Sequence, residues 1–194
     1  NNDTVVRPDV LSVLVEAQKC RGNNLVGSVL YEYEKPDRIQ SAGGRYNAHT
    51  GWIRINKEPD SRVDYPVGAS LFITQEFYRR VGPMCESYFL FFEEYDWVLR
   101  AMAEDMGFCV EEKSRIYHKG GGVIGNASKF SDFYGLRSKI LFNRKYFGLT
   151  VFLFYVLHGG LYIINRIRRG QFDRIPMFFK LLRNPKLHYH EVVD

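Results

Sequence analysis

Apolar residues recur at helical spacing in several stretches of the chain and form short runs between them. Apolar positions three to four residues apart predict helices over residues 7–17, 75–81, 93–106 and 131–146. Short apolar runs bounded by turn residues predict strands over residues 25–31, 52–55, 65–74, 108–110 and 115–118. Because helices alternate with strands, this pattern predicts an α/β fold with helices layered on a sheet.

Proline and glycine mark the expected breaks between these elements. Pro8 suits a first helical position, and Asp9 suits the positive end of the helix dipole. Lys35-Pro-Asp predicts a turn, Ala42-Gly-Gly predicts a flexible loop, and Gly107 predicts the end of the helix over residues 93–106. Between the loop and the third strand, the polar and poorly periodic sequence is expected to be irregular.

Residues 147–164 contain no Asp, Glu, Lys or Arg and are mostly apolar. Eighteen residues is the short end for a membrane-spanning helix, and His158-Gly-Gly interrupts the stretch. Basic residues flank it on both sides: Arg137, Lys139, Arg144, Lys145, Arg166, Arg168, Arg169 and Arg174. Because a spanning helix usually has them on one side, we expect a bent hairpin or an interfacial helix pair on an anionic membrane surface. The alternative is a buried helix that covers the sheet, followed by a solvated basic tail.

Charge is divided unevenly along the chain. Residues 1–134 carry 16 Lys/Arg and 19 Asp/Glu, a net charge of −3, whereas residues 135–194 carry 11 and 3, a net charge of +8. An anionic partner is therefore expected in the C-terminal third. Nucleic acid is not expected, since no recognisable reading motif accompanies the basic charge.

The composition is that of a folded protein, with 45% hydrophobic and 25% charged residues in 194. Cys20, Cys85 and Cys109 are far apart and lack metal-ligand spacing, which predicts a reduced, cytoplasmic protein with buried thiols. No secretory signal opens the chain, which agrees with that compartment.

Candidate chemistry is concentrated in residues 88–97, where three carboxylates stand among aromatic residues. Ionised carboxylates avoid apolar surroundings unless they are paired or bound, so Glu93, Glu94 and Asp96 are candidates for a site that handles protons, a metal or sugar hydroxyls. The alternative is helix electrostatics, because carboxylates favour a helix N-terminus. In that reading Asp96 and Arg100 form a surface ion pair worth about 0.2–0.5 kcal/mol.

Two further segments suggest the binding of a cation and of phosphate. Asp3 is either a turn residue or a ligand of a hard divalent cation, which prefers oxygen. His118 is either a locally satisfied residue at the end of a strand or part of a phosphate loop with the glycines that follow Lys119, including Gly120 and Gly121.

Small and aromatic residues give weaker signals. Gly68 and Ala69 fit close backbone packing or leave space for a sugar, and Trp97 and Trp52 fit the core or a sugar-stacking surface. Three later residues either contact a ligand or pack: Ser128, Tyr134 and Arg137.

Four segments of the chain together resemble the C-terminal part of a known enzyme family. They are Asn1-Asn-Asp-Thr, Gly68-Ala-Ser-Leu-Phe-Ile with Val81-Gly-Pro-Met, Phe92-Glu-Glu-Tyr-Asp-Trp-Val-Leu-Arg-Ala and Tyr117-His-Lys-Gly-Gly-Gly. In this order they resemble the family 2 glycosyltransferases of the GT-A fold, and among them the bacterial rhamnosyltransferase-like members. The resemblance covers roughly residues 1–145.

The resemblance implies a partial GT-A fold, which is a Rossmann-like mixed sheet flanked by helices, over residues 1–145. Residues 146–194 would be a helical, basic and membrane-associated extension. Asp3 and His118 would hold Mg²⁺ or Mn²⁺, and His118, Gly120 and Gly121 would contact the diphosphate. Glu94 would be the catalytic base, although many relatives have Asp there, so that Glu93 or Asp96 could share the role. The implied acceptor side comprises Gly68, Ala69, Ser70, Trp97 and Arg137.

The implied reaction is inverting transfer from a nucleotide-diphosphate sugar to a hydroxyl of a glycan or lipid-linked glycan, in bacterial cell-envelope polysaccharide synthesis. The enzyme would be peripheral at the inner face of the cell membrane. The family's N-terminal nucleotide-binding half is not among these residues, so we expect the isolated chain to bind donor weakly and turn over little or not at all. The alternative is a non-catalytic, membrane-associated glycan-binding or assembly module. No oligomeric state is predicted.

Overall fold

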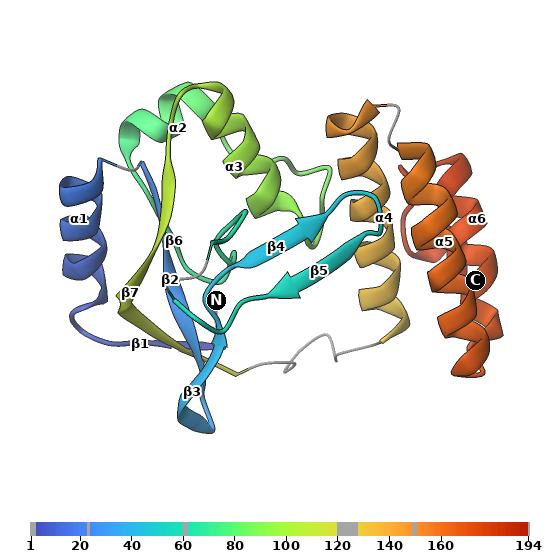
Figure 1. Cartoon of the computed structure of the whole chain (residues 1–194), viewed down its shortest axis with the longest axis horizontal. Coiled ribbons are helices and arrows are strands. Elements are labelled where there is room, and N and C mark those ends of the chain that lie inside the picture. The colour runs from blue at the N-terminus through green and yellow to red at the C-terminus, as the bar shows by residue number, and fades with distance from the viewer. Residues whose placement is uncertain (1–2, 23, 60–61, 120–127, 149–150, 194) are drawn as a thin grey trace. The chain divides into compact units, whose positions relative to one another are not determined.

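The computed structural model describes residues 3–22, 24–59, 62–119, 128–148 and 151–193, which pack as two compact units (Figure 1). The first unit comprises Asn1–Arg45, Ile53–Cys85 and Glu93–Gly122, and the second comprises Tyr46–Trp52, Glu86–Phe92 and Val123–Asp194. The boundary predicted after residue 145 falls inside the second unit, because the helix that ends at Tyr146 packs with the helices after it.

A mixed sheet forms the centre of the first unit. Its strands run in the order β1 (Thr4–Val6), β7 (Phe108–His118), β2 (Leu25–Glu32) and β3 (Lys35–Ser41), and β6 (Leu71–Ile73) pairs with the start of β2. The β2 and β7 strands are parallel, whereas the other pairs are antiparallel. Two further strands, β4 (Gly44–Asn47) and β5 (Trp52–Ile55), form a separate sheet. The predicted α/β class is confirmed at the level of a mixed sheet flanked by helices.

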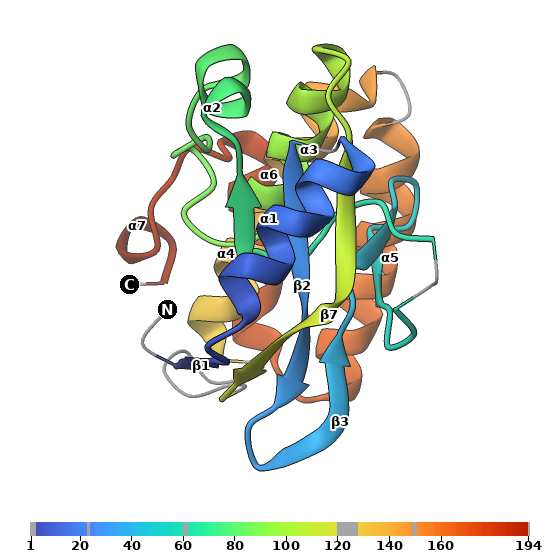
Figure 2. The same ribbon diagram turned by 90° about the vertical axis from the view of Figure 1, so that its left-hand side faces the viewer.

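The central strand β2 is buried on both faces. Every residue from Leu25 to Tyr31 is buried, as expected of a strand covered on each side. Val26 and Leu30 pack against α1 (Val10–Arg21), which crosses one face of the sheet (Figure 2). On the opposite face lies α3 (Glu93–Ala103) (Figure 1). The predicted strand over residues 25–31 and the first predicted helix are thus confirmed.

Local signals explain where the helices of the first unit begin and end. The α1 helix continues to Arg21 and stops at Gly22, whose φ of 65° suits a residue without a side chain. Asp9 is its N-cap, so Pro8 lies outside the helix rather than at its first position. The α2 helix (Gln75–Val81) has the predicted bounds, and the Thr74 hydroxyl accepts a hydrogen bond from the Phe77 N–H.

Three predictions about strands and turns were wrong in detail. The turn lies at Tyr33–Glu34, and Lys35-Pro-Asp begins β3 instead. The strands predicted over 108–110 and 115–118 are one strand, β7. Only residues 71–73 of the predicted 65–74 strand are extended in the sheet. Pro66 packs closely over Gly27 of β2: a Cβ added to Gly27 would lie 2.4 Å from the Pro66 Cβ. This close contact holds the segment around Pro66 against β2.

The second unit is a group of helices: α4 (Lys129–Tyr146), α5 (Val151–Arg168), the short 3₁₀ turn η2 (Phe172–Arg174), α6 (Ile175–Arg183) and α7 (His190–Val193). Their core contains Phe133, Ile140, Phe154, Met177 and Leu181. The α5 helix passes through Gly159-Gly160 without a break, so the predicted bend at His158-Gly-Gly is absent from this helix.

Membrane crossing and cysteine pairing can both be assessed for the described residues. Within those ranges, no helix combines the length and the apolar character needed to cross a membrane. All three cysteines are free, as predicted. The prediction that they are buried was wrong: Cys20 is exposed on the last turn of α1, and Cys85 and Cys109 are only partly buried.

Candidate functional site

The pairing of β1 with β7 places Asp3 beside His118. In the antiparallel register Thr4 lies opposite His118, and the Lys119 N–H donates to the Asp3 carbonyl over 2.9 Å. The two side chains then meet, with Asp3 Oδ2 at 3.4 Å from His118 Nε2. Two residues at opposite ends of the first unit's sequence are therefore brought together by strand pairing.

Gln40 holds the other nitrogen of the His118 ring. Its Oε1 lies 2.7 Å from His118 Nδ1, which therefore donates to it. In the neutral ring this leaves a lone pair on Nε2, directed at an Asp3 carboxylate oxygen. Asp3 Oδ1 is buried and has no hydrogen-bond partner among the residues that the structure describes. The His118 Nε2 lone pair and the Asp3 carboxylate oxygens are all electron-pair donors that face one another. A divalent cation fits between such groups.

The pair is not a complete metal site by itself. Within the described residues no group of three His, Cys, Asp or Glu side chains is placed to hold a metal. A cation here would need further oxygen ligands, such as phosphate or water. Gly120 and Gly121, predicted to contact a diphosphate, lie outside the described residues.

Glu93 and Glu94 form the first turn of α3 and are both partly buried. One oxygen of each carboxyl, Oε2, is buried and has no hydrogen-bond partner in the described part of the chain. Burial, and next the charge of Glu93, raise the pKa of Glu94 to about 7, although hydrogen bonds from its own N–H and from the Gly68 N–H oppose the rise. Burial also raises the pKa of Glu93. A carboxyl with a pKa near 7 can accept a proton at neutral pH and still be largely ionised just above it.

The residues before these carboxylates have an unusual backbone. Phe91 and Phe92 both have positive φ, at 65° and 72°. For residues with a bulky side chain the left-handed conformation costs about 1–2 kcal/mol each. The Phe92 ring is nevertheless buried, with edge contact to Tyr46 at 5.0 Å between centroids. These two residues directly precede Glu93, the first residue of α3.

Asp96 lies on a different side of α3 and has a different role. Its side chain is fully buried and paired with Arg100 Nε at 2.9 Å. Arg100 also donates to the Val81 and Pro83 carbonyls. The predicted ion pair is present, but it is buried at the carboxylate rather than at the surface. Asp96 therefore anchors α3 to the end of α2, and its carboxylate is already neutralised by a cation.

The three residues of the segment Gly68-Ala69-Ser70 lie in different surroundings. Gly68 is exposed beside the Glu94 carboxyl, and a Cβ there would lie 3.6 Å from the Glu94 Cδ. Ala69 packs against the apolar core under α1. The Ser70 hydroxyl lies 2.7 Å from that of Ser28, whose oxygen is also 2.8 Å from the Ser114 hydroxyl. Gly68 is thus the member that contacts Glu94, and its N–H donates to the carboxyl.

The two remaining acceptor-side candidates are held by the protein itself. Trp97 is buried, and its Nε1–H donates to the Gly82 carbonyl over 2.9 Å. Arg137 is buried in the second unit, where it donates to the carbonyls of Ser87 and Leu187. Of the other candidates, Ser128 caps α4 and Tyr134 is buried among rings, with Phe89 at 4.6 Å. These contacts are those of packing and capping residues.

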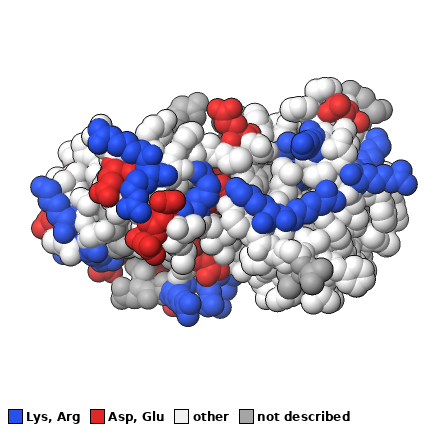
Figure 3. All heavy atoms as spheres, turned by 90° about the horizontal axis from the view of Figure 1, so that it is seen from above, with Lys and Arg blue, Asp and Glu red and all other residues white. Residues whose placement is uncertain are grey.

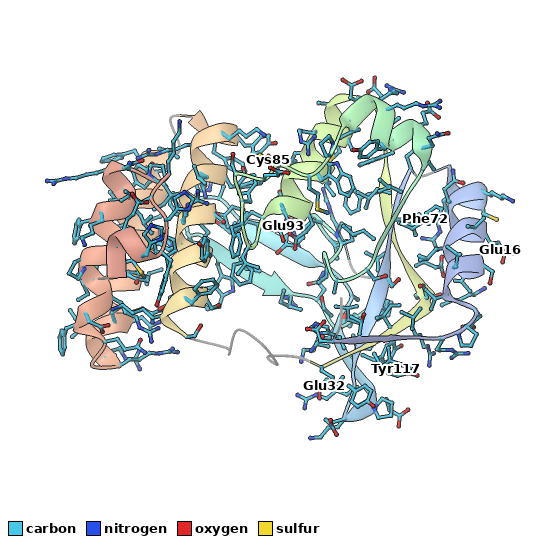
Figure 4. All side chains as sticks on the ribbon, turned by 180° about the vertical axis from the view of Figure 1, so that it is seen from behind. Glu16, Glu32, Phe72, Cys85, Glu93 and Tyr117 are labelled. Atoms are coloured by element: carbon cyan, nitrogen blue, oxygen red, sulfur yellow. The ribbon has the colours of Figure 1, made fainter. Side chains whose placement is uncertain are left out.

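The carboxylate pair and the Asp3–His118 pair belong to the same unit. Figure 4 shows Glu93 at the start of α3 and Tyr117, the neighbour of His118, on β7.

Sequence reasoning missed Gln40, which carries no signal beyond its place in a strand. It also missed a polar pair in the second unit. Burial lowers the pKa of Lys139 to about 8. Burial, and next the charge of Lys139, lower the pKa of His158 to about 3, and His158 Nδ1 lies 3.0 Å from the Thr50 carbonyl oxygen. Neither residue could have been recognised without knowing that α4 and α5 pack together.

Comparison with known proteins adds no relative. No family model matches the chain, and no curated protein matches its sequence.

Proposed function

We propose that this chain carries the acceptor-side and catalytic-base portion of a metal-dependent sugar transferase of the GT-A type. The observation that carries the proposal is the Glu94 carboxyl beside Gly68, which has a raised pKa and a buried oxygen without a hydrogen-bond partner among the described residues. The proposal is supported by the pair of Asp3 and His118, which lies in the same unit. The substrates are a nucleotide-diphosphate sugar and a glycan or lipid-linked glycan with a free hydroxyl.

Glu94 acts as the general base in this proposal. Its carboxylate takes the proton of the acceptor hydroxyl while the hydroxyl oxygen forms a bond to the anomeric carbon. The bond from that carbon to the diphosphate breaks, and its electron pair leaves with the nucleoside diphosphate. Attack opposite to the leaving group inverts the anomeric centre. Glu93 raises the proton affinity of Glu94 through its charge and is a supporting group.

Asp3 and His118 would hold the divalent cation, Mg²⁺ or Mn²⁺. When bound, the cation supplies positive charge that stabilises the leaving diphosphate. Gln40 positions the imidazole so that Nε2 is the ligating nitrogen, as groups behind a metal-binding histidine commonly do. The buried Asp3 Oδ1 has no other described partner, so it is available for this role.

A lipid-linked acceptor would require the enzyme to work at a membrane surface. We place it at the inner face of the cell membrane, where nucleotide-sugars are made and where anionic lipids attract basic segments. The net charge of +8 in residues 135–194 supports this location.

Substitution of Glu94 tests the proposal. Sugar transfer is measured in the whole polypeptide that the gene encodes, with Glu94→Gln and Glu93→Gln side by side. Loss of at least a hundredfold in turnover for Glu94→Gln, with acceptor binding retained and a smaller loss for Glu93→Gln, is expected. Unchanged turnover in Glu94→Gln would remove it as the base. Acceptor binding without any transfer in the unaltered protein would favour the glycan-binding module instead.

A further inference from the structure

The outer face of α5 is a wide apolar surface that no described residue covers. Its large apolar side chains are 44% to 69% exposed. We call them the α5 apolar face: Phe152, Leu153, Val156, Leu157, Leu161, Ile164 and Ile167. At about 100° per residue they occupy roughly half of the helix circumference, over a length of about 22 Å. The other half, with Phe154, Gly159 and Tyr162, is buried against the second unit.

A surface of this kind in a folded protein usually marks an interaction site. Seven neighbouring exposed apolar side chains on one helix exceed the scattered apolar residues of ordinary surfaces. Gly160 lies in the middle of the face, and a Cβ there would meet nothing within 4 Å. The face therefore offers no hydrogen-bonding side chain and no pocket, but a smooth apolar strip.

Charge identifies the occupant. The α5 helix contains no Asp or Glu. Arg168 and Arg169 are exposed at the C-terminal end of α5 and have no ion-pair partner among the described residues. Arg144 and Lys145 are exposed at the end of α4, which precedes the start of α5. Figure 3 shows basic side chains outweighing acidic ones over the second unit on the side it presents. An anionic surface complements both ends at once.

A second copy of the chain is a poorer occupant. Because both ends of α5 are basic, a parallel or an antiparallel helix pair brings like charges together. No acidic side chain on α5 compensates them. A helix that is too short and interrupted by polar residues to cross the bilayer can still lie in its interface, with the apolar strip among the acyl chains and arginines at the headgroups.

We propose that the α5 apolar face is a docking surface for an anionic phospholipid membrane, with α5 lying in the membrane plane. The inference shares the membrane location with the proposed function but does not depend on sugar transfer. Membrane docking is tested without donor, acceptor or metal. A negative result for docking therefore does not bear on the proposed sugar transfer, and the reverse also holds.

The test is co-sedimentation of the 194-residue chain with vesicles of phosphatidylcholine, with or without 30% phosphatidylglycerol. We expect binding to the anionic vesicles at low salt, and at least tenfold weaker binding to pure phosphatidylcholine or in 0.5 M salt, because the attraction of the basic residues needs anionic lipid and is screened by salt. Leu157→Asp with Ile164→Asp should reduce binding at least tenfold. Leu11→Asp with Met102→Asp, at exposed positions of α1 and α3, is the matched control and should leave it unchanged.

A second pair of variants tests the charge. Arg168→Glu with Arg169→Glu should abolish the preference for anionic vesicles, whereas Lys19→Glu with Arg79→Glu, which removes the same charge from the first unit, should not. Circular dichroism confirms that each variant is folded. Failure of the unaltered chain to bind at low salt would overturn the proposal. So would a concentration-dependent dimer, seen by sedimentation velocity, that the α5 aspartates dissociate while vesicle binding persists.

Discussion

Replacing Glu94 with Gln should stabilise the first unit, and the gain should depend on pH. The carboxyl has an ordinary pKa of 4.5 and a pKa of about 7 in the folded chain, chiefly because burial disfavours its charged form. Between these two values the folded protein holds a proton that the unfolded chain has released. Stability of the unaltered protein therefore falls as pH rises through this window, and the loss is complete above about pH 8.

The size of the effect follows from the same two values. At 1.36 kcal/mol per pH unit, the rise from 4.5 to about 7 corresponds to about 3 kcal/mol. Glutamine has nearly the same shape and no charge, so Glu94→Gln removes this cost. The variant and the unaltered protein should have similar stability at pH 4, and the variant should be more stable by about 3 kcal/mol at pH 8.

The assay is urea unfolding at pH 4 and pH 8, followed by tryptophan fluorescence. The chain has two tryptophans, and Trp97 is buried on α3 close to Glu94 in sequence. In a Trp52→Phe background the signal therefore reports on the first unit alone. Glu112→Gln, at an exposed site on β7, is the control for removal of a carboxylate. A gain that is the same at both pH values, or a loss at pH 8, would refute the account of Glu94 as a desolvated carboxyl.

The remaining predictions concern the metal site, the pH dependence of activity and the packing of α5. Gln40→Leu should weaken Mn²⁺ binding by about 10–100-fold in a calorimetric titration, whereas Gln75→Leu on α2 should not; equal affinities would exclude Gln40 as a positioning residue. Turnover should rise with pH through about 7 and then level, because Glu94 must lose its proton to act as base; a flat profile from pH 5 to 9 would contradict this. Gly159→Ala should destabilise the second unit by about 1–3 kcal/mol, because its Cβ would lie 2.5 Å from the Phe178 Cζ, whereas Gly160→Ala meets nothing and should stabilise it by about 0.5–1 kcal/mol. The two midpoints in thermal unfolding should move in opposite directions, and a shift in the same direction would show that this packing is wrong.

Elements with a strong local pattern could be predicted from the sequence. The apolar run of β2 predicts a buried strand, and the apolar spacing of α2 and α4 predicts helices. In each case the residues at the ends of the element agree with the apolar period. The turn before β3 could not be placed, since Pro36 fits a turn and a strand start alike. Gly159-Gly160 reads as a break, but the Phe178 ring packs on Gly159 and the helix continues. Whether a helix continues through such glycines depends on residues that are distant in the sequence and that the local pattern does not reveal.

The candidate site divides in the same way. The residue types of Asp3, His118, Glu93 and Glu94 predict a site for a cation, phosphate and proton transfer, and the structure brings Asp3 to His118. The contribution of Gln40 depends on strand pairing across the sheet, for which no short motif exists. The burial of the Asp96 pair depends on how α3 meets α2, which spacing along one helix cannot reveal.

The most direct test of the central claim is release of nucleoside diphosphate from a panel of nucleotide-diphosphate sugars. It is measured in the whole polypeptide that the gene encodes, with a glycolipid extract as acceptor and with Mn²⁺ or a chelator. We expect release with at least one donor that requires acceptor, cation and Asp3, and that falls at least a hundredfold in Glu94→Gln. Release that continues at full rate with the chelator and in Glu94→Gln, or no release with any donor, would contradict it.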